Sequence, residues 1–257
     1  MTTLSTNRWF TLPRPNPQAS VRLFCFPYSG GGTSIFRLWP DGLPQEIEIC
    51  SIQYPGHESR LREPPFTRLE PLVQALTKAI QPHLNMPFAF FGHSLGTLVS
   101  FELARQLCRL GLPAPVHMFV SGGRSPSISS PNPPYHQLPN AEFMVELRRL
   151  NGTPEAVLQN AELMQLFLPI LRADFAIMET YSYTIEELLD APISAFCGRK
   201  DNEVSCDEVS AWREQTRGRF ELHVLPGDHF FLHSTVLPQI LQIVAQSLLP
   251  LQKKESL

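Results

Sequence analysis

The segment that decides the fold is Phe88-Ala89-Phe90-Phe91-Gly92-His93-Ser94-Leu95-Gly96. Its apolar half is typical of a buried strand, and a helical pattern follows from Thr97 to Leu110. A serine between two glycines at a strand-to-helix junction is the nucleophile-elbow arrangement. The turn is tight, so the residues two before and two after Ser94 must be small, and Gly92 and Gly96 meet that demand. Because glycine and serine are common residues, this pattern needs support from the rest of the chain.

Short apolar runs recur along the chain, with helical patterns between them. The runs predict strands at Val21–Phe26, Ile47–Gln53, Phe88–Phe91, Val116–Ser121, Ile193–Cys197 and Glu221–Leu225. The helical patterns lie at Thr33–Leu38, Leu69–Leu84, Leu95–Leu110, Val204–Thr216 and Thr235–Leu249. Strands that alternate with helices predict an α/β fold, with a mostly parallel central sheet and helices on both faces.

A long stretch without a predicted strand interrupts this alternation. Residues 125–134 are rich in serine and proline, and the next fifty residues carry helical periodicity. Such an insertion predicts a helical cap over the carboxyl ends of the sheet, where open α/β proteins bind their ligands. We therefore expect a core of residues 1–124 and 191–257 and a helical lid insertion of residues 125–190.

Composition excludes several classes of protein. Lysine and arginine number 21 against 24 aspartate and glutamate, and this net charge of −3 provides no broad basic surface for nucleic acid. The first twenty residues hold no continuous apolar segment, and no run approaches the roughly 18 apolar residues of a membrane span. We therefore expect no contact with nucleic acid or membrane. We also expect a monomer.

The cysteines predict the redox state and the compartment. Their number is odd, they are scattered, and most lie in apolar runs: Cys25, Cys50, Cys108, Cys197 and Cys206. This usage predicts reduced, buried thiols and a cytoplasmic location. No histidine and cysteine cluster has the spacing of a zinc site, so we expect neither a metal nor another cofactor.

The serine of an elbow needs a histidine to accept its proton and a carboxylate to orient that histidine. In this type of fold the chain order is serine, acid, histidine, each on a loop after a strand. Asp201 follows the strand predicted at Ile193–Cys197 and is the predicted acid. Glu203 and Asp207 are the alternatives, but both lie nearer the following helix, where acids serve the first turn.

His229 is the predicted base, because it follows the strand predicted at Glu221–Leu225 and precedes the last helix. His233 is the rival, and the preceding Asp228 is expected to point elsewhere. His93, inside the elbow, is expected to pack or to line the edge of the pocket. The remaining histidines lack a strand-end context and are expected to be structural or exposed: His57, His83, His117, His136 and His223.

The negative charge that forms on the attacked carbonyl needs two backbone donors in place beforehand. One is the amide of Leu95, directly after the serine. The second is expected from Tyr28 or Ser29, in the loop after the first predicted strand, where Gly30-Gly31-Gly32 permits close approach to a ligand. A phosphate-binding loop is the alternative, but this loop lacks the P-loop lysine and does not fit G-x-G-x-x-G.

The chain resembles type II thioesterases, the stand-alone editing hydrolases of polyketide and non-ribosomal peptide synthesis. The matching segments span nearly the whole chain: Phe26–Gly31, Tyr54–Arg60, Phe91–Gly96, Leu171–Phe175, Glu179–Tyr181 and Gly227–Leu232. The chain departs from the family at two positions, with Tyr28 where histidine is usual and His57 where arginine is usual. Neither departure touches Ser94, Asp201 or His229.

This resemblance implies an α/β-hydrolase fold and hydrolysis of acyl thioesters on the phosphopantetheine arm of acyl- or peptidyl-carrier proteins of a modular synthase. It also implies that the insertion is a mobile lid in which Asp174 and Tyr181 are structural. Carrier proteins are typically acidic, so Arg60, Arg62 and Arg68 are candidates for docking one, although scattered surface arginines explain them equally well. A general carboxylesterase or lipase and a non-catalytic partner of a synthase are the alternative functions.

Overall fold

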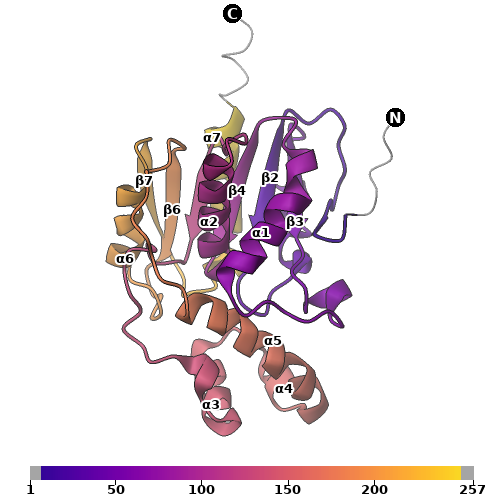
Figure 1. Cartoon of the computed structure of the whole chain (residues 1–257), viewed down its shortest axis with the longest axis vertical. Coiled ribbons are helices and arrows are strands. Elements are labelled where there is room, and N and C mark those ends of the chain that lie inside the picture. The colour runs from indigo at the N-terminus through magenta and orange to yellow at the C-terminus, as the bar shows by residue number, and fades with distance from the viewer. Residues whose placement is uncertain (1–6, 250–257) are drawn as a thin grey trace, which may run out of the picture.

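A sheet of seven strands forms the centre of the protein, in a computed structural model that describes residues 7–249 (Figure 1). The spatial order is β1-β3-β2-β4-β5-β6-β7. The strands are β1 (Phe10–Thr11), β2 (Val21–Phe26), β3 (Ile47–Ile52), β4 (Phe88–His93), β5 (Met118–Ser121), β6 (Ile193–Gly198) and β7 (Phe220–Leu225). Only β1 is antiparallel to its neighbour, so the predicted mostly parallel sheet is confirmed.

Helices connect these strands and form the insertion. The α-helices are α1 (Leu69–Ile80), α2 (Leu95–Arg109), α3 (Asn140–Leu150), α4 (Glu155–Leu158), α5 (Ala161–Glu179), α6 (Cys206–Ser210) and α7 (Leu237–Leu248). Short 3-10 helices are η1 (Thr33–Phe36), η2 (Trp39–Asp41), η3 (Glu58–Arg60), η4 (Gln81–His83), η5 (Tyr135–Gln137), η6 (Ala211–Gln215) and η7 (Phe231–His233). The single helix predicted at Val204–Thr216 is thus α6 followed by η6.

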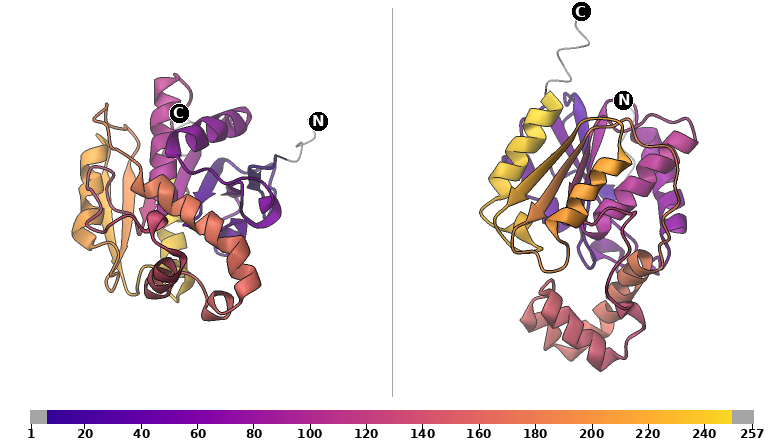
Figure 2. Two further views of the ribbon diagram at one scale, coloured as in Figure 1. Left: turned by 60° about the horizontal axis from the view of Figure 1, so that its bottom comes forward. Right: turned by 90° about the vertical axis from the view of Figure 1, so that its left-hand side faces the viewer.

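Each face of the sheet packs against its own layer of helices, as the right-hand view of Figure 2 shows. On one face, α1 and α2 insert apolar side chains such as Leu76 and Leu103 against the sheet, and Trp212 of η6 extends this layer. On the other face, α7 packs through Ile240 and Val244. The strands between the two layers are almost continuously apolar, as expected for a parallel sheet that is buried on both faces.

The insertion between β5 and β6 carries α3, α4 and α5 and lies beyond one end of the sheet (Figure 1). It has a small apolar cluster of its own, formed by Phe143, Leu147, Leu158, Met164 and Leu171. The first turn of α5 is capped by Asn160, whose side chain accepts hydrogen bonds from two backbone amides. The helical periodicity of the sequence therefore corresponds to a helical layer that covers one edge of the sheet.

The expectation of five reduced thiols is wrong for two of them. Cys197 near the end of β6 and Cys206 at the start of α6 form a disulfide, with their Cα atoms 5.5 Å apart. The loop between them folds back, so two residues that are nine positions apart in sequence face each other. Cys25 and Cys50 are free and buried, whereas Cys108 is free and exposed.

Candidate active site

Ser94 occupies a strained turn between β4 and α2. Its backbone has φ 51° and ψ −116°, and it precedes the first residue of the helix. A β-carbon at Gly92 would lie 2.3 Å from the carbonyl oxygen of Gly96, and one at Gly96 would lie 2.1 Å from that of Phe26. Both glycines are therefore required sterically, as the elbow pattern predicts.

Asp201 lies in the loop after β6, and its side chain is only 1% exposed. Its Oδ1 accepts hydrogen bonds from the amides of Glu203 at 2.8 Å and Val204 at 3.0 Å. Its Oδ2 lies 2.8 Å from Nδ1 of His229, in the loop after β7. Because a carboxylate accepts, Nδ1 of His229 carries the hydrogen, and Nε2 of the neutral ring is left free to accept a proton.

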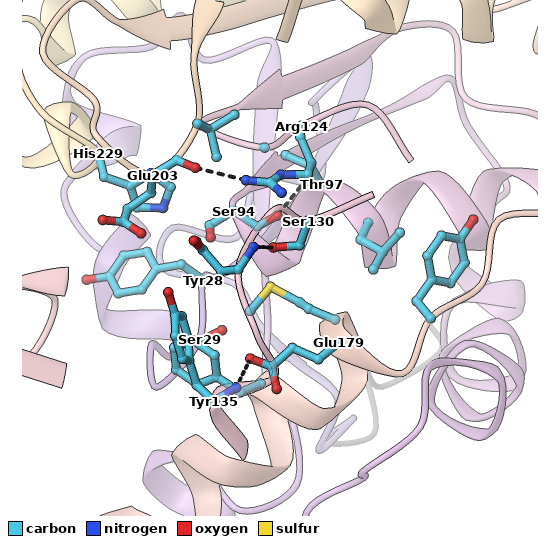
Figure 3. A pocket seen from close by; sticks show the side chains of 18 of the residues that line it. Tyr28, Ser29, Ser94, Thr97, Arg124, Ser130, Tyr135, Glu179, Glu203 and His229 are labelled. Carbon is cyan, nitrogen blue, oxygen red and sulfur yellow. Dashed lines mark hydrogen bonds between the residues drawn. The ribbon is translucent and has the colours of Figure 1, made fainter. Parts of the chain in front are cut away.

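Ser94 and His229 line the same cavity, which has a volume of about 730 Å³. Figure 3 shows both side chains, with Tyr28 and Ser29 nearby. The walls of the cavity come from the loops after β2, β4, β5, β6 and β7 and from the insertion. The insertion contributes Leu147, Leu171 and Phe175 among others. The fold thus brings the serine and the Asp201–His229 pair to one hollow beneath the insertion.

Backbone donors converge on the elbow. The amide of Ser94 donates to the carbonyl of Ser121 at 2.8 Å, which fixes the turn against β5. The amide of Leu95 opens the first turn of α2, so it has no acceptor within that helix. The Leu95 amide therefore remains the predicted first donor.

The loop after β2 provides the second set of amides. Gly31 donates to the carbonyl of Tyr28 at 2.9 Å, and Gly30 donates to Oδ2 of Asp174 at 2.7 Å. Within residues 7–249, the amides of Tyr28 and Ser29 have no hydrogen-bond acceptor. Both residues line the cavity, so the two predicted donors remain the candidates.

Sequence relatives and solved structures agree with this architecture. A family model described as a thioesterase domain matches residues 21–248. The chain belongs to the thioesterase family. This thioesterase is 50% identical over 229 residues to the gramicidin S biosynthesis protein GrsT of Aneurinibacillus migulanus, a match that covers 89% of the chain and 90% of GrsT.

Two solved structures extend the comparison. RedJ, a thioesterase of the prodiginine biosynthetic pathway in Streptomyces coelicolor, matches this thioesterase with a TM-score of 0.84 at 37% identity, over 92% of each chain. BorB, the type II thioesterase of the borrelidin biosynthetic cluster, matches with a TM-score of 0.84 at 34% identity, over 93% of this chain and 97% of BorB. The predicted α/β-hydrolase fold and the resemblance to type II thioesterases are both confirmed.

The alternative site residues have other partners in the thioesterase. Glu203 pairs with Arg149 of α3 at 2.6 Å, and Asp207 lies exposed in the first turn of α6. Nε2 of His233 lies 2.9 Å from the hydroxyl of Tyr28. Oδ1 of Asp228 accepts from a backbone amide two residues further on. None of these contacts resembles the one between Asp201 and His229.

His93 lies beneath the predicted base. Its Nδ1 is 2.9 Å from the hydroxyl of Ser121, and its ring is 5.4 Å from that of His229. Complete burial, reinforced by the neighbouring histidines, holds its pKa well below the ordinary value. His93 is therefore neutral at physiological pH and adds no positive charge beneath His229.

The sequence did not predict the side chain that holds the glycine loop in place, which is that of Glu58. The carboxylate of Glu58 accepts from the amides of Thr33 and Ser34 at 2.9 Å and 3.1 Å, so it fixes the turn that follows the loop. A β-carbon at Gly32 would lie 2.3 Å from Glu58 Cδ, which shows how closely the two segments pack. Glu58 lies in the segment Tyr54–Arg60, which matches the family, but nothing in that segment identifies the amides of Thr33 and Ser34 as its partners.

One of the three arginines suggested for docking is not a surface residue. Arg60 is buried, with Nη2 2.6 Å from Glu63 and its guanidinium 4.3 Å from the ring of Trp9. Its planar group needs these partners once it is removed from water. Arg62 and Arg68 are exposed.

No group of three or more histidine, cysteine, aspartate or glutamate side chains in residues 7–249 is arranged to hold a metal ion. No helix in that range is long and apolar enough to cross a membrane.

Proposed function

We propose that this thioesterase hydrolyses acyl thioesters held on the phosphopantetheine arm of acyl- or peptidyl-carrier proteins, with Ser94, His229 and Asp201 as its triad. The observation that carries the proposal is the hydrogen bond of Asp201 to Nδ1 of His229 at the cavity that Ser94 lines. That bond leaves Nε2 as the only ring nitrogen that can take a proton from the serine.

Acylation begins when Ser94 Oγ attacks the thioester carbonyl carbon and His229 Nε2 takes the hydroxyl proton. The oxyanion is stabilised by the amide of Leu95 and that of Tyr28 or Ser29. Collapse of the tetrahedral species breaks the carbon–sulfur bond, and His229 returns the proton to the thiolate. The Asp201 carboxylate stabilises the imidazolium that forms between these steps.

Deacylation repeats the same chemistry with water. His229 removes a proton from the attacking water, the oxyanion forms at the same amides, and Ser94 leaves with the proton. The products are a free carboxylic acid and a carrier thiol ready for reloading. On a synthase blocked by a wrong acyl group, this outcome amounts to editing.

The carrier-bound substrate is supported by the kind of proteins that the chain resembles. GrsT is named for gramicidin S biosynthesis, and BorB is a type II thioesterase of a biosynthetic cluster. The insertion of residues 125–190 would act as a lid that admits the arm and excludes bulk water. Exposed Arg62 and Arg68 are the remaining arginines of the suggested docking patch.

We further propose a monomer that works in the cytoplasm beside its synthase. The Cys197–Cys206 disulfide is unusual for that compartment, where thiols are kept reduced. Counting free thiols in protein isolated from whole cells under alkylating conditions therefore tests the location together with the pairing.

The Ser94→Ala variant tests the reaction. We expect loss of hydrolysis on the order of a thousandfold or more, because the nucleophile is removed. The Ser127→Ala variant, which changes an exposed serine of the cavity wall, is the matched control and should retain activity. Full activity of Ser94→Ala would end the proposal, and so would failure of a fluorophosphonate probe to label Ser94 in folded wild-type protein.

Substrate class is tested with one acyl group presented in two forms, as a thioester on a carrier protein and as a simple oxygen ester. We expect a higher kcat/KM for the carrier-bound thioester. A strong preference for the free ester would favour the carboxylesterase alternative.

A further inference from the structure

A buried pair, His57 and Asp174, joins three segments around the glycine loop. His57 Nε2 lies 2.9 Å from Oδ2 of Asp174, and both side chains are 3% exposed. His57 belongs to the loop after β3, and Asp174 belongs to α5 of the insertion. The same Oδ2 accepts the amide of Gly30 at 2.7 Å, so one carboxylate oxygen serves both segments.

The contacts of His57 require two ring hydrogens. Nδ1 lies 3.1 Å from the carbonyl oxygen of Pro55, which can only accept, and Nε2 faces the carboxylate of Asp174. Both nitrogens therefore donate, so the ring is an imidazolium. Burial alone would lower the pKa of His57, but the charge and hydrogen bond of Asp174 outweigh it and raise the pKa above its ordinary value.

The other groups around His57 favour the same charge or are neutral. Glu58, next along the chain, adds to the attraction. The ring of Tyr54 lies 5.8 Å away, and burial raises the pKa of its hydroxyl, so it stays neutral. The Arg60 amide donates to the carbonyl of His57 at 2.8 Å, while its guanidinium pairs with Glu63. On the glycine loop and α5, Asp174 is the titratable group in contact with the ring.

The pair sets the position of the loop that carries the predicted oxyanion donors. Gly30 directly follows Ser29, whose amide is one of the two candidates. A β-carbon at Gly30 would lie 2.6 Å from Leu171 Cδ2, so α5 rests directly on this part of the loop. A shift of Asp174 therefore moves the amides of Tyr28 to Gly30 relative to Ser94.

We propose that the His57–Asp174 pair positions the glycine loop, which carries the predicted oxyanion donors, for catalysis. Loss of the His57 proton at alkaline pH then loosens this loop and lowers turnover. This inference rests on the proposed function. A neutral His57 has one hydrogen for two acceptors, so either the Pro55 carbonyl or the Asp174 carboxylate loses its donor in a buried site. An unpaired buried acceptor is costly, and the loop relaxes to relieve it.

The test is the pH dependence of kcat and KM on a carrier-bound thioester for the wild type and His57→Arg. Arginine keeps its charge at every pH of the assay and can donate to both acceptors. We expect the wild-type kcat to fall by about tenfold or more at alkaline pH, the size of a small misplacement of catalytic groups, with little change in KM. The His57→Arg variant should lack this alkaline decline. Equal alkaline declines in both proteins would overturn the proposal.

Two further variants test whether the alkaline decline of kcat comes from the His57–Asp174 pair. The His223→Arg variant introduces the same residue on β7, away from the loop, and should keep the wild-type alkaline decline. The Asp174→Asn variant retains an acceptor for Gly30 but loses the charge, and should have a low kcat at every pH. A flat, wild-type kcat for Asp174→Asn would also overturn the proposal.

A measurement without turnover covers the case in which His57→Arg does not fold. In Ser94→Ala protein, the NMR signals of the His57 ring nitrogens and of the Gly30 amide are followed against pH. We expect both to titrate with one midpoint above the ordinary pKa of histidine. A Gly30 signal that ignores the His57 titration would contradict the inference, even if Ser94 were shown not to be the nucleophile.

Discussion

The hydroxyl oxygen of Tyr28 lies 2.9 Å from Nε2 of His233, and this contact joins the loop after β2 to η7 after β7. The two rings also meet edge to face, with centroids 5.7 Å apart. Burial lowers the pKa of His233 and raises that of Tyr28, so both are neutral near pH 7. A loop with predicted oxyanion donors is thus tied to the loop that carries His229.

Removing this hydroxyl should affect catalysis more than folding. In Tyr28→Phe, the ring contacts remain but His233 loses its partner, and we expect a several-fold fall in kcat with a loss of about 1 kcal/mol in the free energy of unfolding. Ser194→Ala is the control, since the hydroxyl of Ser194 lies 2.9 Å from Nε2 of His117, away from these loops and outside the residues that line the cavity. The control variant should lose similar stability and keep its kcat. Equal kcat values in both variants would argue that the contact between Tyr28 and His233 does not support catalysis.

The Asp201→Asn variant tests the role of the predicted acid. An amide in place of the carboxylate can favour the wrong histidine tautomer, and we expect kcat to fall on the order of 10⁴-fold with the fold retained. Asp207→Asn, an exposed carboxylate in the first turn of α6, is the control and should retain its activity. Steady-state kinetics on the same thioester measures both, and a larger loss for Asp207→Asn would reverse the assignment.

The parts of the site that sequence predicts are those fixed by local chemistry. The elbow follows from a steric rule that involves only Gly92, Ser94 and Gly96. Asp201 and His229 follow from the order in which parallel strands deliver loops to one edge of the sheet. The sequence predicts the strand Val21–Phe26 with the bounds that β2 has, because a buried parallel strand is a nearly continuous apolar run, here broken only by Arg22.

The parts that sequence misses depend on distant partners. His57 and Asp174 are 117 positions apart, and nothing local in either segment identifies the other. Arg60 gives no sign of burial, because Trp9 and Glu63 supply its environment only after folding. The disulfide was missed for a different reason, since its pairing depends on how the loop after β6 turns. Two residues are also too few for β1 to produce a periodic signal.

The close packing beneath the elbow predicts a severe effect for Gly96→Ala. The added β-carbon would meet the Phe26 carbonyl at 2.1 Å, and backbone cannot move as a flexible side chain can. We expect a loss of about 3 kcal/mol or more in the free energy of unfolding, at the upper end of the cost of overpacking, measured with urea. Gly111→Ala is the control, with φ +63° but no atom within 4 Å, and it should pay only the backbone strain, about 1–2 kcal/mol. An equal or smaller loss for Gly96→Ala would contradict the steric account.

The disulfide closes a short loop that contains Asp201. Its removal in Cys206→Ser should lower the free energy of unfolding by about 2–3 kcal/mol, because the unfolded chain regains freedom. Cys108→Ser changes an exposed free thiol and should have little effect. Thiol titration of unfolded, unreduced wild type should count the three free cysteines. A count of five would show that the pair is reduced in the purified protein.

Protonation of the buried His117 should lower the free energy of unfolding in acid. Burial, with a smaller contribution from His223, lowers its pKa to about 4, and its Nε2 lies 2.9 Å from the hydroxyl of Ser194. Because the unfolded state takes up this proton first, near pH 6.5, stability is lost as the pH falls from about 6.5 to 4. The loss reaches about 3 kcal/mol by linkage. His117→Gln removes the titrating group, so its free energy of unfolding should fall less steeply over that range. Parallel pH profiles for the two proteins would show that His117 is not the group responsible.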